Sequence, residues 1–296
     1  MECYYQQNML DEKNKKLLTR VSNRVSFLYV EHACIEQSKF GVQINTYKKI
    51  SEIPITTFSC LLLGPGTSIT HRAIENITDA GCSICWMGSD VCRFYTFGIP
   101  STQSSKNLLT QVKYHESKSL HLEVVHKMYN YRYPDDRIKS KTVEELRGFE
   151  GQHVKEAYKH WAEHFGVDWK GRKYDVKDFE HDDLANKYLS ALNHVFYGIT
   201  TAVINILGYS PALGFIHTGH ISSFVFDIAD CFKEELTIPL AFKLTSETDH
   251  FDRHLMLKEY RQALVSLKII QRMVDLLDGL FYNEAVVDVD LTFWNG

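Results

Sequence analysis

The sequence predicts an α+β fold in which a β-rich N-terminal domain is followed by an all-α C-terminal domain. Before residue 97, segments rich in β-branched and aromatic residues alternate with turn residues, as in a series of short strands. Beyond residue 108, apolar residues recur at intervals of three and four, the spacing of amphipathic helices. The stretch 98–107 contains Pro100 and several Ser and Thr residues, and it predicts a linker between the two domains.

The N-terminal domain is expected to span residues 1–97. A turn at 64–67 (GPGT) follows an apolar strand, and Thr67 or Ser68 is placed to cap a short helix after it. Gly81 is expected to end that helix, and the turn 88–90 connects the last two strands. The predicted strands are 21–34, 40–44, 57–63, 82–87 and 91–97, and the predicted helix is 69–79.

The C-terminal domain, residues 108–296, is expected to consist of helices that carry the catalytic function. Charge-rich loops are predicted at 132–141 and 166–182. Each helix has an apolar stripe that indicates packing against a shared core. The predicted helices are 108–131, 143–165, 183–207, 222–244 and 251–282.

The composition is that of an ordinary globular protein, with 44% hydrophobic and 24% charged residues. We find no apolar run long enough for a membrane span and no basic start followed by an apolar core, so we expect a cytoplasmic protein without a secretion signal. The seven cysteines are an odd number in apolar contexts, which favours reduced, buried thiols. Residues 106–173 are locally basic although the net charge is −4, so a nucleic-acid face there is one interpretation and a solvated helix surface is the other.

Two carboxylates in an apolar run suggest one half of a metal site. Asp227 and Asp230 are three residues apart and therefore lie on the same side of a helix. Burying unpaired charge is costly, and a metal ion or a basic partner would offset that cost. His217 lies just upstream, between Gly214 and Gly219, where the backbone can approach closely.

Glu150 is the candidate for the other half of the site. It is flanked by Gly148 and Gly151 within a predicted helix, and each interior glycine costs about 0.5–1 kcal/mol against alanine. Glu150, His217 and Asp230 would offer two carboxylates and an imidazole to a divalent ion, with Asp227 as a fourth candidate. Oxygen ligands suit Mg²⁺, and an imidazole makes Mn²⁺ equally suitable.

The alternative interpretation is that these residues have a purely structural role. His217 would then be a hydrogen-bonded core histidine, and the acids would make salt bridges. Sequence spacing cannot decide between the two readings, because Glu150 and His217 are more than sixty residues apart. If these residues bind a metal ion, the predicted chemistry is phosphodiester cleavage or strand transfer, since the ion can activate an attacking oxygen and stabilise charge on phosphorus.

Several basic and aromatic residues are candidates for DNA contacts. Tyr174 follows Arg172 and Lys173 in a loop, where its ring could stack on a base while the cations hold phosphates; a solvated loop is the alternative. Arg93 and Arg147 are candidates for phosphate contact or for neutralising nearby acids. Tyr197 is also a candidate, although a tyrosine in an apolar helix is commonly part of the core.

Five segments, taken together and in this order, carry a resemblance to a known family. They are 63–67 (LGPGT), 146–151 (LRGFEG), 171–175 (GRKYD), 214–219 (GFIHTG) and 223–230 (SFVFDIAD). The chain resembles the CRISPR spacer-acquisition integrase, the first of the Cas proteins, in its type I-E form. The similarity runs from about residue 24 to residue 244 and thus covers most of the chain.

This resemblance implies a β-rich N-terminal domain and an α-helical catalytic domain. It also implies a metal-dependent DNA endonuclease and integrase whose ion is held by Glu150, His217 and Asp230, with Asp227 close by. Such an enzyme joins the 3′-hydroxyl ends of a captured DNA fragment to the repeat at the leader side of a CRISPR array. The expected chemistry is a transesterification without a covalent protein intermediate.

The resemblance further implies the partners. Two homodimers assemble around a dimer of the small second Cas protein, giving a hetero-hexamer. The expected nucleic acids are double-stranded protospacer DNA with single-stranded 3′ ends and the repeat DNA of the array. Tyr174 and Tyr197 occupy positions that engage DNA ends or read the motif that marks a protospacer, and Lys233 fits the DNA-contacting pattern.

Three positions depart from the family pattern. His32 stands where a tyrosine often splays the duplex, and His220 stands where a lysine is usual in the motif-reading pocket. Ser68 occupies a commonly basic position. Both histidines remain candidate DNA contacts. Because the imidazole of His32 can still stack, we expect weaker or altered contacts at the splayed end of the DNA rather than none.

Two other functions compete with the integrase reading. The first is a structure-selective, metal-dependent nuclease that acts on branched DNA without an array. The second is a catalytically idle DNA-binding scaffold that positions a partner. The complete set of candidate ligands argues against the scaffold, and dependence on a small partner protein would separate the integrase from the free nuclease.

Overall fold

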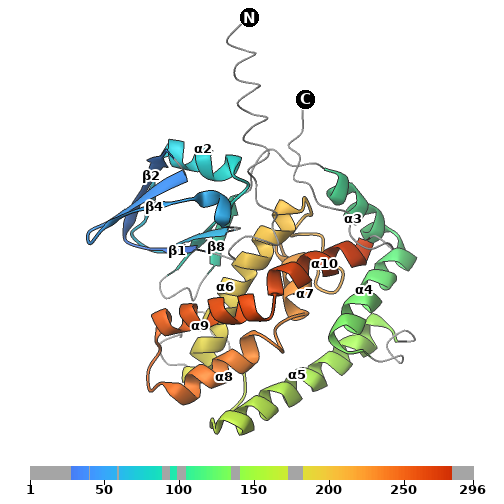
Figure 1. Ribbon diagram of the computed structural model, residues 1–296. Helices are drawn as coiled ribbons and strands as arrows, with labels where there is room; N and C mark the ends of the chain where they lie inside the picture. Colours follow the sequence, from blue (N-terminus) through green and yellow to red (C-terminus); the bar gives the residue numbers. More distant parts are fainter. Residues whose placement is uncertain are drawn as a thin grey trace, which may run out of the picture.

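A computed structural model describes residues 28–39, 41–58, 60–88, 94–98, 105–134, 141–172 and 183–281. It has a strand-rich N-terminal region and a helical C-terminal region, with the strands and α2 gathered on one side of the helices (Figure 1). The predicted α+β class is therefore confirmed. No helix in the described ranges combines the length and the apolar character needed to cross a bilayer.

The first of two four-stranded sheets packs against the helical region. Its order is β1-β5-β7-β8, with parallel pairing except between β7 and β8. Every residue of β5 is buried, as expected for a strand covered on both faces. The strands are β1 (Leu28–Val30), β5 (Cys60–Leu63), β7 (Ser83–Met87) and β8 (Phe94–Gly98).

The second sheet has the order β4-β3-β2-β6. It lies beside α2 (His71–Asp79), which begins at Thr70, whose hydroxyl accepts a hydrogen bond from the Ala73 amide. The cap is thus a few residues later than Thr67 or Ser68, because Ser68 pairs in β6. The elements are β2 (Ala33–Ser38), β3 (Gly41–Thr46), β4 (Ile50–Ile53), β6 (Ser68–Ile69) and the 3-10 turn η2 (Ile55–Thr57).

One expected strand is broken into two. A single strand at 21–34 was expected, but β1 ends at Val30 and β2 begins at Ala33 in the other sheet. Between them His32 has a φ of 47°, a left-handed conformation that interrupts any extended strand. Residues on both sides of the break are rich in β-branched and aromatic side chains, so the sequence pattern does not indicate that the chain passes from one sheet to the other.

Three long predicted helices are each divided in two. Ser117 separates α3 from α4 and caps the latter through its hydroxyl, and Lys268, with a φ of 51°, separates α9 from α10. A turn at 231–236 separates α7 from α8. The helices are α3 (Lys106–Glu116), α4 (Lys118–Arg132), α5 (Val143–Phe165), α6 (Leu184–Ile206), α7 (Ser223–Asp230), α8 (Thr237–Glu247), α9 (Arg253–Ser266) and α10 (Ile269–Phe281).

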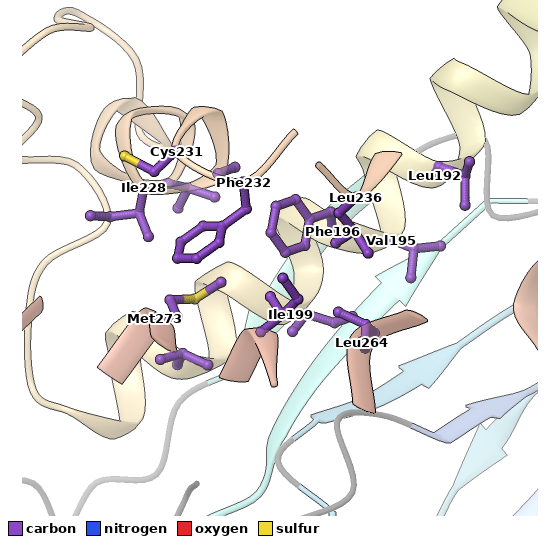
Figure 2. Packing of buried hydrophobic residues seen from close by; sticks show 14 of the residues in the cluster. Leu192, Val195, Phe196, Ile199, Ile228, Cys231, Phe232, Leu236, Leu264 and Met273 are labelled. Carbon is purple, nitrogen blue, oxygen red and sulfur yellow. The ribbon is translucent and has the colours of Figure 1, made fainter. Parts of the chain in front are cut away.

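Helix α6 is the centre of the larger core. Its side chains Leu192, Val195, Phe196 and Ile199 meet residues from α7, the following turn, α9 and α10 (Figure 2). The rings of Phe196 and Phe232 meet edge to face, with centroids 6.4 Å apart. Because both sides of α6 are covered, its apolar character extends well beyond one stripe.

The core continues from the helices into the first sheet. Gly198 of α6 lies over this sheet, and an added Cβ there would come within 3.3 Å of Leu62 Cδ2. The thiols of Cys60 and Cys85 lie 3.4 Å apart beneath the Gly198 carbonyl, and both are free and buried, as expected for reduced cysteines. The first sheet and the helical region thus share one buried cluster in which α6 packs against β5, β7 and β8, and the strand-rich region has a second cluster of its own.

Candidate metal and DNA site

A cleft of about 450 Å³ brings several of the predicted site residues together. It is formed by the end of α4, the middle of α5, one side of α6, α7 and the turn that follows α7. Its polar lining is Arg132, Glu150, Tyr158, Arg172, Ser190, Asn193, His194, Tyr197, His217, Asp230, Lys233 and Glu234. The long sequence separation between Glu150 and His217 is therefore closed by the helix packing.

Asp227 organises the loop that carries His217. Its carboxylate is fully buried and accepts hydrogen bonds from the amides of Phe215, Ile216 and His217 at 2.5–3.1 Å. A buried charge needs such donors to offset its desolvation. Asp227 therefore points into the loop and does not line the cleft, which favours a role in positioning His217 over direct ligation.

The imidazole of His217 is oriented by the same carboxylate. Nδ1 lies 2.8 Å from Asp227 Oδ1, so it donates there and leaves Nε2 directed toward Asp230 Oδ2, 3.9 Å away. The hydrogen bond to Asp227 raises the pKa of His217 above its ordinary value, although burial opposes the shift. A carboxylate behind one ring nitrogen is the usual support of a metal-ligating histidine.

Asp230 is paired with a lysine that is only partly exposed. Lys233 Nζ lies 2.5 Å from Asp230 Oδ1 and donates to the Tyr197 hydroxyl at 2.7 Å. Burial opposes the ionisation of Asp230, but Lys233 and Arg132 outweigh it and hold the pKa of Asp230 below its ordinary value. Asp230 is thus an ionised carboxylate in the cleft, as a metal ligand must be.

Glu150 is held by two residues of α4. Tyr129 donates its hydroxyl to Glu150 Oε2 at 2.7 Å, and Arg132 donates to Oε1 at 2.5 Å. Arg132 also reaches Glu234 Oε1 at 3.0 Å, and the Tyr133 hydroxyl donates to the same oxygen. The carboxylates of Glu150 and Glu234 are therefore joined through one guanidinium.

The residues of the cleft fit a divalent ion with one adjustment. In the described residues, no three His, Cys, Asp or Glu side chains lie close enough together to hold an ion as they stand. Asp230 and Nε2 of His217 face each other in the cleft, but both oxygens of Glu150 are engaged, Oε1 by the Arg132 guanidinium and Oε2 by the Tyr129 hydroxyl. Glu150 would have to turn from Arg132 to join them, and the donor set would then be the two carboxylates and one imidazole expected for Mg²⁺ or Mn²⁺.

Two of the predicted DNA-contact arginines already have protein partners. Arg147 donates to the Ile216 carbonyl and so braces the loop of His217 from α5. Arg172 lines the cleft and donates to Asn186 Oδ1 at 2.8 Å and to Ser190 Oγ at 3.0 Å. Arg172 thus provides positive charge inside the cleft, whereas Arg147 is tied to a backbone carbonyl.

The remaining predicted contacts lie outside the cleft or outside the described residues. His220 is exposed and accepts a hydrogen bond from the Ser222 amide at 3.1 Å. His32 is exposed at the break between β1 and β2. Arg93 and Tyr174 are not among the described residues.

The sequence analysis missed Tyr129, Arg132 and Glu234. Arg132 was assigned to a charged loop, but it is the last residue of α4 and its side chain is only 5% exposed. Glu234 directly follows Lys233, and nothing in its local sequence separates it from the exposed Glu235. Its partner lies 102 residues away, so no local pattern marks it.

The fold and the cleft together define a class of protein. A strand-rich region packs on a helical region, and the helices gather an imidazole, carboxylates and basic side chains in one cleft. Such a set is typical of metal-dependent enzymes that act on phosphodiesters. The comparisons with known proteins identify the family within this class.

The chain belongs to the CRISPR associated protein Cas1 family, whose profile matches residues 132–266. It is 37% identical to CRISPR-associated endonuclease Cas1 2 of Thermus thermophilus, over 91% of this chain and 83% of that protein. CRISPR-associated endonuclease Cas1 of Escherichia coli is 35% identical over 88% of this chain and 86% of that protein. The resemblance inferred from the sequence is confirmed, and the Escherichia coli relative is compatible with a type I-E form.

A solved structure gives the same relation. The crystal structure of a TtCas1-DNA complex aligns with a TM-score of 0.67 and 37% identity, covering 89% of this chain and 98% of that chain. Because the alignment covers 89% of this chain, most of its architecture is shared with that structure.

Proposed function

We propose that this chain is an endonuclease and integrase of CRISPR adaptation. In this proposal it joins the 3′-hydroxyl ends of captured protospacer DNA to the leader-side repeat of a CRISPR array by transesterification. The observation that carries the proposal is the convergence of His217, Asp230 and Glu150 on one cleft, in a chain whose relatives are named Cas1 endonucleases. Family membership without these residues would fit the idle scaffold equally well.

The proposed ligands of a Mg²⁺ or Mn²⁺ ion are Glu150, His217 and Asp230. When bound, a divalent ion helps to activate an attacking oxygen and to stabilise charge on a phosphodiester. The protein supplies the orientation: Asp227 fixes the Nδ1–H tautomer of His217, and Arg147 holds the same loop from α5. Nε2 of His217 is then free to ligate.

Basic residues of the cleft are proposed to hold the DNA backbone. Lys233 and Arg172 line the cleft, and their charges can bind phosphate oxygens next to the carboxylates. Tyr197 shares Lys233 with Asp230, so its hydroxyl is placed to orient the lysine beside the reacting group. Tyr174, Arg93, His32 and His220 remain proposed DNA contacts.

The proposed partners are those of the family. The DNA complex of the Thermus thermophilus relative supports a DNA partner for this chain. A homodimer, and two such dimers around a dimer of the small second Cas protein, complete the proposed assembly. A cytoplasmic location is part of the proposal, since the captured DNA and the array would be met there.

A joining reaction tests the proposal against its two competitors. A short duplex with free 3′-hydroxyls is incubated with a supercoiled plasmid that bears the leader and repeat, the small partner, and Mg²⁺ or Mn²⁺. We expect joining at the leader–repeat boundary that is lost without metal and in Glu150→Ala. Lys170→Ala is the control, because Lys170 is exposed, is not among the residues that line the cleft, and pairs with Asp168.

Other results of this joining experiment would support one of the two competing functions. Metal-dependent nicking that ignores both the partner and the repeat would show a free nuclease of branched DNA. DNA that is bound but unchanged under every condition would show a scaffold. Joining by Glu150→Ala at the wild-type rate would remove Glu150 from the site.

A further inference from the structure

The cleft contains a buried cation with two acidic partners, and only one of them is a proposed metal ligand. Arg132 is 5% exposed, and it donates to Glu150 at 2.5 Å through one terminal nitrogen and to Glu234 at 3.0 Å through the other. The exposed fractions of the Glu150 and Glu234 side chains are 18% and 28%. One guanidinium therefore bridges both acids in the protein without metal, and its single positive charge is shared between them.

Binding of a metal ion would break one of these two pairs. Both oxygens of Glu150 are already engaged, Oε1 by Arg132 and Oε2 by the Tyr129 hydroxyl, so an ion that takes the place of Arg132 on Oε1 would separate Glu150 from the guanidinium. A buried arginine left without a counter-charge is strongly unfavourable. The second acid, Glu234, removes this difficulty because Arg132 can remain paired with it.

Arg132 has further contacts on the Glu234 side that do not involve Glu150. Arg132 also donates to the Tyr133 hydroxyl at 2.9 Å, and Tyr133 in turn donates to Glu234. The guanidinium lies over the Tyr133 ring, 5.0 Å from its centroid. Its buried Nε has no hydrogen-bond acceptor among the described residues, so the two acids are reached through the terminal nitrogens alone.

We propose that Glu234 is a positioning residue for metal binding: it retains Arg132 when Glu150 turns to the ion. This inference rests on the proposed function, since it takes Glu150 as a metal ligand. Glu234 itself does not ligate in this scheme. Its contribution is to hold the charge of Arg132 so that the metal-bound cleft contains no unpaired guanidinium.

The neighbouring acid provides a matched control. Glu235 pairs with Arg272 at 2.6 Å, is about as exposed as that arginine, and does not line the cleft. Glu234→Gln and Glu235→Gln therefore remove the same charge from adjacent positions. Only the first removes the second partner of Arg132.

The experiment measures Mn²⁺ binding without DNA by calorimetry, and by the loss of the free-ion signal in electron paramagnetic resonance. We expect Glu234→Gln to weaken binding roughly tenfold, the lower end of the effects seen for residues that support metal ligands. Glu235→Gln should bind like the wild type. Arg132→Met should bind at least as tightly as the wild type, since Glu150 no longer has to leave a cation.

A double variant tests whether Glu234 acts through Arg132, as in a double-mutant cycle. In the Arg132→Met background, Glu234→Gln should have no further effect on Mn²⁺ affinity, because its role acts through Arg132. Equal affinities of Glu234→Gln and wild type would overturn the inference, and so would a loss in the Arg132→Met background, which would make Glu234 a ligand. If Arg132→Met does not fold, Arg132→Gln, which removes the same charge but keeps a hydrogen-bond donor, takes its place in the cycle.

Failure of the proposed function has a different signature. A wild-type protein that binds no Mn²⁺, or a Glu150→Ala variant that binds it normally, would remove the metal site itself. If the wild type binds Mn²⁺, Glu150→Ala does not, and Glu234→Gln binds like the wild type, the metal site stands and only the role proposed for Glu234 is contradicted.

Discussion

At the scale of single residues, Asp227 has the most demanding environment in the cleft region. It is 1% exposed, and its two oxygens accept from three backbone amides and one imidazole nitrogen. All of these donors come from the loop that precedes α7. The carboxylate therefore replaces the regular backbone pairing that this loop lacks.

Asp227→Asn is expected to lower the free energy of unfolding by about 3 kcal/mol, because the charge-assisted bonds are lost and an amide NH₂ would face N–H donors. The measurement is urea unfolding followed by circular dichroism. Asp252→Asn is the control: Asp252 caps α9 through Leu255, and asparagine caps a helix equally well. A loss no larger than that of the control would contradict the organising role of Asp227.

A second residue-scale prediction concerns Asp278 on α10. Burial and the neighbouring Asp275 raise its pKa to about 6. Because the folded state favours the protonated acid, the stabilisation is present below the ordinary pKa near 4 and is lost as the pH rises through about 6. Above that pH the ionised Asp278 carboxylate therefore destabilises the fold.

Asp278→Asn mimics the protonated acid and should be more stable than the wild type at pH 8. The gain is expected to be about 1 kcal/mol, since partial exposure screens the effect, and it should shrink at pH 5. Urea unfolding at both pH values measures it, with the exposed Asp249→Asn as the control. A gain that is equal at the two pH values would not come from this ionisation.

At the scale of elements, helix α5 has clear capping signals at both ends and two glycines beside Glu150 in its middle. Thr142 and Glu145 form a capping box at its start, and Gly166 ends it in a left-handed conformation with a φ of 67°. Between these ends, Gly148 and Gly151 flank Glu150. An added Cβ at either glycine would meet no atom within 4 Å, so nothing in the described part of the chain requires glycine there.

Alanine at Gly148 or Gly151 should therefore stabilise the protein by about 0.5–1 kcal/mol each, because alanine has the higher helix propensity. Thermal unfolding of the metal-free protein measures this gain. Binding of the DNA duplex is measured on the same variants. Higher stability with weaker DNA binding would show that the glycines leave room for the substrate, whereas lower stability would mean that α5 is not a regular helix there.

At the scale of the whole molecule, an ion pair joins the strand-rich region to α9. Arg253 binds the Glu31 carboxylate through both terminal nitrogens, one of them at 2.7 Å, although the two residues are 222 positions apart. Its guanidinium also lies 5.6 Å from the Tyr29 ring centroid. Both side chains are about one-fifth exposed, so this pair is better shielded than a typical surface pair.

Arg253→Met should lower the free energy of unfolding by about 1–2 kcal/mol, since a half-buried carboxylate loses a two-point partner. Arg72→Met is the control, because its pair with Glu75 is exposed and should contribute almost nothing. Urea unfolding compares the two variants. Equal effects would show that the contact between the two regions depends on the shared apolar core alone.

The local sequence determined the fold class and most helix positions. Helix α5 was predicted with the observed ends, and α6 within one residue, because caps and apolar spacing are short-range signals. The same analysis named the three candidate ligands, His217, Asp230 and Glu150, since charge in apolar or glycine-rich surroundings is visible in sequence. Their presence around one cleft agrees with that prediction, and their role as ligands remains to be tested.

The tertiary structure alone decided where the long segments break and which charges pair. At His32 and Lys268 the backbone enters a left-handed conformation that no local pattern indicates. The break at Ser117 is the exception, because its hydroxyl caps α4 and is a short-range signal. Arg132 reaches Glu234 over 102 positions, a separation at which neither residue carries information about the other. Propensity and periodicity act within a few residues, whereas charge pairing in the cleft depends on how whole helices pack.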